Sequence, residues 1–119
     1  MTGLTVFGLK NCDSCKKAIS ALTAAGLAHT FVDIREDADR VVKVPDWLDA
    51  VGAKALVNTR STTWRNMSGE DREIADEDPA GVLIAHPTLI KRPVIEAGTT
   101  VLVGWSADSL DALLADAAS

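Results

Sequence analysis

Asn11-Cys12-Asp13-Ser14-Cys15-Lys16-Lys17 is the stretch that decides the fold, and it contains both cysteines of the chain. It follows the apolar run Leu4–Phe7 and leads into a segment with helical periodicity. Two thiols separated by two residues, where a strand passes into a helix, are typical of thiol-disulfide chemistry, because the first helical turn brings the second sulfur back to the first. The stretch therefore predicts a redox-active cysteine pair.

The residues on either side of this stretch predict a βαβ opening. An alternating strand is expected over Leu4–Gly8, an amphipathic helix over Asp13–Ala25 with Gly26 as its stop, and a second strand over His29–Ile34. The crossover should be right-handed and the two strands parallel.

The middle of the chain predicts a helical insert at about residues 44–86. Pro45 fits the first position of a helix that Gly52 ends, and short helices are expected over 54–57, from Ser68 to about 77 and over 80–86. Ser68 is expected to cap the second of these three helices and Asp78 the third. Residues 58–65, which are polar, β-branched and basic, are expected to form a loop.

The C-terminal part predicts a hairpin and a last helix. Residues 89–96 should be extended, with an interruption at Arg92-Pro93, and should pair through a turn at Ala97-Gly98 with a strand over 100–103. Ser106 should open an amphipathic helix whose buried face holds Leu110, Leu113 and Leu114. The predicted fold is α/β, with β-α-β and then β-β-α around a mixed sheet, in a single domain spanning residues 1–119.

Length, composition and charge narrow the function classes. A chain of 119 residues with 47% hydrophobic and 24% charged residues fits one globular domain, and no apolar run approaches the ~20 residues of a membrane span. A net charge of −5 argues against direct binding of nucleic acid or of an anionic membrane. The N-terminus lacks the pattern of a secretory signal, so we expect the cytoplasm, where a close cysteine pair is more often catalytic, redox-sensing or metal-binding than structural.

Three separated motifs carry a resemblance to a known family. They are Lys10-Asn11-Cys12-Asp13 with Lys16-Lys17-Ala18, the run from Leu56 to Arg65, and His86-Pro87 leading to Ile90-Lys91-Arg92-Pro93. With these motifs in this order, nearly the whole chain resembles the ArsC/Spx family of arsenate reductase-like proteins, and within it the YffB-like branch. The resemblance implies a thioredoxin-like, glutaredoxin-like fold.

Cys12 is the candidate nucleophile. It is expected at the N-terminal end of a helix, where backbone N–H groups, the helix dipole and nearby Lys16 and Lys17 favour a thiolate, while Asp13 opposes it. Cys15 is either a resolving cysteine or a small packing residue, and the sequence leaves both open.

The expected substrate site is basic although the chain as a whole is acidic. Lys10, Asn11 and Lys16 lie beside Cys12 in the sequence, and a locally basic site suits a small thiol or an anionic substrate. The resemblance implies that Arg60 and Arg92 hold the anion, as forked guanidinium groups can. It also implies that Pro93 is the cis-proline that faces the active-site cysteine.

The chain departs from the arsenate reductase pattern in two places. Residues 101–106 contain no basic residue where the reductases carry a third arginine, and Gly8 stands where they tend to have a histidine. Both departures weaken the case for arsenate reduction. The sequence therefore predicts a monomeric cytosolic thiol-disulfide oxidoreductase with no bound cofactor and with glutathione as co-substrate.

Alternatives from other classes remain. A Spx-like regulator that binds RNA polymerase would use the two cysteines as a sensor, and an arsenate reductase would use Cys12 on the oxyanion. A zinc site would need His29 or His86 as a partner of the cysteines, but neither belongs to a paired ligand motif, so no metal is expected.

Overall fold

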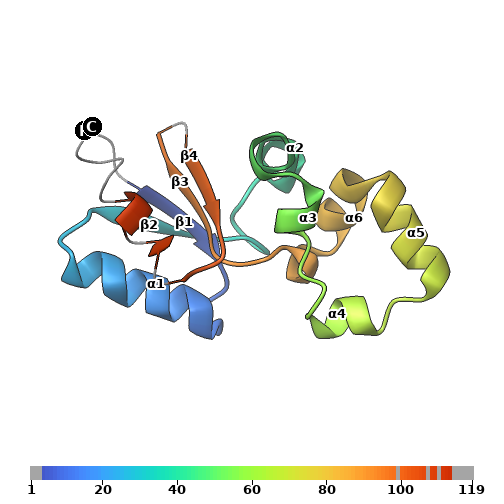
Figure 1. The fold of residues 1–119 in the computed structure, drawn as a ribbon, viewed down its shortest axis with the longest axis horizontal. Coiled ribbons are helices and arrows are strands. Elements are labelled where there is room, and N and C mark those ends of the chain that lie inside the picture. Colours follow the sequence, from blue (N-terminus) through green and yellow to red (C-terminus); the bar gives the residue numbers. More distant parts are fainter. Residues whose placement is uncertain (1–3, 99, 107, 110, 114–119) are drawn as a thin grey trace. The chain divides into compact units, whose positions relative to one another are not determined.

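The computed structural model describes residues 4–98, 100–106, 108–109 and 111–113, and the chain divides into two compact units (Figure 1). The first unit comprises Met1–Ala38 and Arg92–Ser119, and the second comprises Asp39–Lys91. The second unit contains the segment expected as a helical insert. The single domain remains a prediction.

The first unit is built on a mixed sheet. Its described strands are β1 (Leu4–Gly8), β2 (His29–Asp33), β3 (Val94–Ala97) and β4 (Thr100–Val103), in the order β2-β1-β3-β4. β1 and β2 are parallel, whereas β3 is antiparallel to both β1 and β4. This confirms the predicted β-α-β and β-β order and gives a thioredoxin-like fold, although β2 ends one residue before the expected Ile34.

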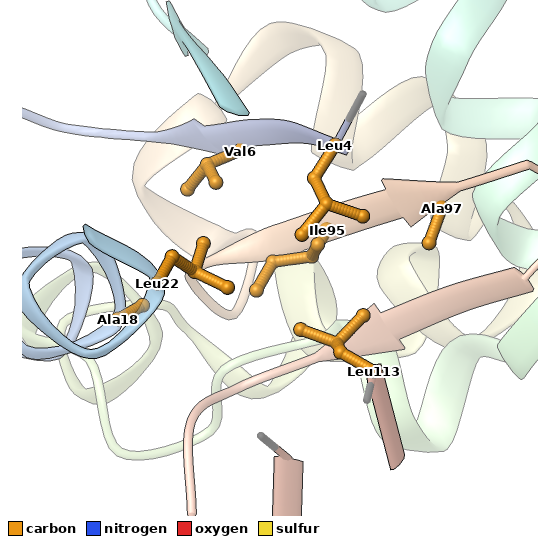
Figure 2. Close-up of a cluster of buried hydrophobic side chains, with 7 residues drawn as sticks. All are labelled: Leu4, Val6, Ala18, Leu22, Ile95, Ala97 and Leu113. Atoms are coloured by element: carbon orange, nitrogen blue, oxygen red, sulfur yellow. The ribbon is translucent and has the colours of Figure 1, made fainter. Parts of the chain in front are cut away.

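Helix α1 (Asp13–Ala24) supplies the other half of the first core. Its buried face holds Cys15, Ala18 and Leu22 at helical spacing, and the last two pack with apolar side chains of the strands. Figure 2 shows this cluster, in which side chains from β1, β3, α1 and the helical residues 111–113 point toward one another: Leu4, Val6, Ala18, Leu22, Ile95, Ala97 and Leu113. The core thus fixes α1 against the sheet.

The expected C-terminal helix is described only in part. Residues 108–109 and 111–113 are helical, and Leu113 is buried in the first core as predicted. The predicted buried residues Leu110 and Leu114 lie outside the described residues.

The described part of the second unit is mostly helical. Its helices are α2 (Arg40–Val51), α3 (Ala53–Leu56), α4 (Thr62–Arg65), α5 (Gly69–Glu77), α6 (Pro79–Ala85) and the 3₁₀ helix η1 (Pro87–Leu89). Two predicted caps are confirmed. The Ser68 hydroxyl accepts from the backbone N–H of Asp71 at 3.1 Å, and the Asp78 carboxylate accepts from that of Gly81 at 3.1 Å.

Two predictions for this unit were wrong. Pro45 does not open its helix, because α2 begins at Arg40 and has Pro45 in its second turn, where a backbone hydrogen bond is lost. Val44 and Trp47 are both fully buried, and burying a side chain such as valine stabilises by about 1.5–3 kcal/mol, which offsets much of that loss. The expected loop at 58–65 contains α4, because Ser61 caps it by accepting from the Trp64 N–H at 3.1 Å.

Within the described part of the chain, no helix has both the length and the apolar character needed to cross a membrane.

Candidate active site

Cys12 is the N-cap residue of α1, as predicted. The turn after β1 closes through a hydrogen bond of 3.2 Å from the Cys12 N–H to the Leu9 carbonyl, and Cys12 has extended backbone angles of φ −99° and ψ 119°. The Cys12 carbonyl accepts the first helical hydrogen bond from the Lys16 N–H at 3.0 Å. Cys12 is half-buried and directly precedes the first helical turn, whose N–H groups have no partner within the helix.

The pKa of the Cys12 thiol lies below its ordinary value of 9.0. Partial burial of the sulfur raises the pKa, but hydrogen bonds from the Cys15 backbone N–H and the Cys15 thiol together with the Arg92 guanidinium lower it more. Arg92 acts both as a hydrogen-bond donor and through its charge. Cys12 is therefore the more readily ionised of the two thiols, which is what a nucleophilic sulfur requires.

Cys15 has the opposite character. Its side chain is 1% exposed, and burial, followed by the hydrogen bond and charge of Cys12, raises its pKa to about 12. Cys15 therefore stays protonated at neutral pH and donates its S–H to the Cys12 sulfur.

Gly8, at the end of β1, makes room for the Cys15 sulfur. A Cβ at this position would collide with Cys15 Sγ and would lie 3.3 Å from Cys15 Cβ. The backbone cannot easily move aside, because the Gly8 carbonyl accepts from the Ile34 N–H at 2.9 Å and Gly8 pairs with Asp33. Any residue with a side chain at position 8, including the histidine that arsenate reductases tend to have there, would clash with Cys15 in this chain.

A pocket of about 270 Å³ opens beside Cys12. Four residues predicted for the site line it together: Lys10, Asn11, Cys12 and Arg92. Leu9 and the end of β2 with the turn after it complete the wall, through Asp33, Arg35 and Glu36. The sequence motifs did not indicate these last three, although the predicted parallel pairing of β1 and β2 places the ends of both strands at one edge of the sheet.

The Arg92-Pro93 peptide bond is cis, as predicted, and Pro93 is buried. The carbonyl of Pro93 accepts from the Gly104 N–H at 2.8 Å, which ties this bond to the segment after β4. Arg92, which precedes this proline, interacts with Cys12, so two residues 80 positions apart in the sequence meet at the pocket. A substrate-binding role of Pro93 remains a prediction.

Two predicted site residues, Lys16 and Arg60, are not among the described residues that line this pocket. Lys16 is exposed on α1. Arg60 belongs to the second unit and is exposed in a turn whose start is fixed by the Asn58 side chain, which accepts from the Arg60 N–H at 3.1 Å. Contributions of Lys16 and Arg60 to the site remain predictions.

The described residues offer little for a metal. No three His, Cys, Asp or Glu side chains gather in a metal-binding group within them, and the His29 ring shares a hydrogen bond of 3.0 Å with the Leu27 carbonyl.

The model of the ArsC family matches residues 7–113. The chain belongs to the ArsC family. A protein of Haemophilus influenzae, itself uncharacterized, is 37% identical over 113 residues, which cover 94% of this chain and 99% of the relative. The solved structure of a YffB protein is 33% identical, with a TM-score of 0.84 over 93% of this chain and 98% of that one. These similarities support the YffB-like branch.

Regulators also occur among the relatives. The global transcriptional regulator Spx of Streptococcus mutans is 22% identical over 114 residues, which cover 93% of this chain and 82% of Spx. The ArsC and Spx similarities together support a thiol-based redox role for this chain.

Proposed function

We propose that the chain is a thiol-disulfide oxidoreductase in which Cys12 is the nucleophile. The observation that carries this proposal is the position of Cys12 at the start of α1, beside Arg92 and an open pocket, with a lowered pKa. A thiolate attacks a disulfide in line with its S–S bond, so a half-buried sulfur with a lowered pKa next to a cavity is the arrangement that favours this reaction.

The reaction has two exchanges at Cys12. The Cys12 thiolate attacks one sulfur of a disulfide R–S–S–R, so that a Cys12–S–S–R bond forms, the original S–S bond breaks, and R–S⁻ leaves and takes a proton from water. In the second exchange at Cys12, a second thiolate R′–S⁻ attacks the R sulfur of the mixed disulfide, so that R–S–S–R′ forms and Cys12 is released as a thiolate. A further R′–S⁻ then exchanges with R–S–S–R′ in solution and gives R′–S–S–R′ and the second R–S⁻. Over the whole sequence one disulfide is reduced by two electrons and two equivalents of the second thiol are oxidised.

Glutathione is our proposed second thiol, and we propose a cytoplasmic monomer that needs no bound cofactor. Arg92 stabilises the Cys12 thiolate in each half of the cycle, and Arg60 is proposed to hold an anionic group of the substrate. Cys15 can serve as an alternative second thiol only after its buried S–H loses a proton, for which the leaving thiolate is the available base.

Replacement of Cys12 by serine tests this proposal. Cys12→Ser should abolish glutathione-coupled reduction of a small disulfide, whereas Ser14→Ala, a change on the same helical turn, should not. Unchanged turnover by Cys12→Ser would refute the assignment. Cys15→Ala distinguishes glutathione from Cys15 as the thiol that attacks the mixed disulfide. Full turnover of this variant with glutathione would show that Cys15 is not needed for that step.

The second candidate is a redox-sensing regulator, which the Spx similarity favours. A regulator would bind the α subunit of RNA polymerase in a way that depends on the Cys12–Cys15 redox state, and a pull-down with reduced and oxidised chain would detect it. Arsenate reduction is less well supported, because two carboxylates, Asp33 and Glu36, share the pocket wall with the cations. Glutathione-coupled arsenate turnover would reveal that activity.

A further inference from the structure

We propose that the pocket beside Cys12 selects small disulfides whose half-molecules carry both an ammonium and a carboxylate group. Arg35 binds the carboxylate and Glu36 binds the ammonium. The inference rests on the proposed function, because it names the substrate class of the same site. Neither residue belongs to the motifs that identified the site, and both lie in the turn after β2, two and three residues beyond its end.

Strand pairing brings these residues to the reacting sulfur. β1 and β2 run parallel with Gly8 paired to Asp33, so the loop that leads to Cys12 and the turn after β2 leave the sheet at the same edge. In parallel α/β sheets the carboxyl ends of the strands are the usual place for ligands. The pocket lies at this edge. Cys12, Asp33, Arg35 and Glu36 are all among the residues that line it.

The backbone of the turn after β2 is well fixed. The Asp33 carboxylate accepts from the N–H groups of Arg35 at 2.8 Å and Glu36 at 3.0 Å, and the Asp33 carbonyl accepts from that of Asp37 at 3.0 Å. Ile34, within the same turn, is fully buried. Arg35 and Glu36 therefore extend from a backbone held at several points, although both side chains are exposed.

The charges around the pocket are mixed in a way that suits a zwitterion. Lys10, Arg35 and Arg92 are cationic, while Asp33 and Glu36 are anionic. One oxygen of Asp33 already accepts two backbone N–H groups, which leaves Glu36 as the carboxylate better able to meet a ligand ammonium. A dicationic ligand would be repelled by three cationic side chains, and a small oxyanion would be repelled by Glu36. A zwitterionic ligand has an oppositely charged partner for each of its two groups.

Four disulfides of similar size test the proposal. Cystine carries both charges on each half, cystamine only ammonium groups, 3,3′-dithiodipropionate only carboxylates, and bis(2-hydroxyethyl) disulfide neither. The loss of the free Cys12 thiol is followed by acid quenching and intact-protein mass spectrometry. Each rate is divided by the rate of the same disulfide with 2-mercaptoethanol, which removes differences in intrinsic reactivity.

Cystine should give the highest normalised rate with the wild-type chain. Glu36→Gln should lower the rates of cystine and cystamine relative to dithiodipropionate by about two- to fivefold, the size of one solvent-screened ion pair. Arg35→Gln should lower the normalised rates of cystine and dithiodipropionate relative to that of cystamine by a similar factor. Both effects should shrink in 0.5 M NaCl, because salt screens charges but does not alter packing.

Asp37→Asn is the matched control. Asp37 is exposed on the same turn as Glu36 and does not belong to the described lining of the pocket, so its loss should leave the order of rates unchanged. Equal normalised rates for the four disulfides, or equal shifts in Asp37→Asn and Glu36→Gln, would overturn the selectivity but leave the oxidoreductase standing. Failure of Cys12 to react with any of the four would overturn both proposals.

Discussion

Replacing Gly8 by alanine tests how the two cysteines are seated. The new Cβ would collide with Cys15 Sγ, and it would also lie 3.3 Å from Cys15 Cβ and 3.5 Å from Phe31 Cε1. The sheet holds Gly8, and buried Ala18 and Leu22 hold α1, so neither element can move away freely. The Cys15 sulfur must therefore leave its position, and its hydrogen bond to Cys12 is lost or weakened.

The expected loss of stability is about 1–3 kcal/mol for overpacking a core site. Alanine has less conformational freedom than glycine in the unfolded chain, which offsets about 0.4–1 kcal/mol of this loss. The net fall in the free energy of unfolding should be on the order of 1–2 kcal/mol, measured by urea denaturation followed by circular dichroism. The pKa of Cys12 should rise as well, because the Cys15 thiol is one of the donors that lower it.

A double-mutant cycle isolates the contact. In a Cys15→Ala background the sulfur is absent, so Gly8→Ala should cost little, with a coupling energy of about 1 kcal/mol or more between the two sites. Gly69→Ala is the matched control, because a Cβ at Gly69 meets no atom within 4 Å. The steric argument fails if Gly8→Ala is as stable as the wild type, or if its cost is the same with and without the Cys15 sulfur.

Three further outcomes are expected. Arg92→Gln should raise the pKa of Cys12, because the guanidinium lowers it by a hydrogen bond and by charge, and an unmoved pH profile of iodoacetamide alkylation would contradict this. In the native wild-type chain, the pH profile of Cys12 alkylation should have its midpoint below pH 9.0, whereas Cys15, with a pKa of about 12, should remain unmodified at pH 10 and react only in urea, as peptide mass spectrometry would show. Ser68→Ala should destabilise by about 1 kcal/mol through loss of the α5 cap, while Ser20→Ala, at an exposed site within α1, should show no such loss in the same urea experiment.

Local sequence patterns were enough to predict most elements. Hydrophobic periodicity predicted α1 to within one residue, and the Ser68 and Asp78 caps marked the starts of α5 and α6. These features depend on residues within a few positions of one another, so the chain specifies them without reference to its distant parts. Pro45 shows the limit of this reasoning, because a buried Trp47 outweighed the local preference of proline for a helix start.

The sequence by itself determined that Cys12 begins a helix after a strand, which is why it could be named as the candidate nucleophile. Only the tertiary structure decided what surrounds it. The parallel register of β1 and β2 brought Arg35 and Glu36 to its pocket, and the position of Arg92, two residues before β3, brought a guanidinium from 80 residues away. Such neighbours depend on strand order and pairing between distant segments, which no local pattern encodes.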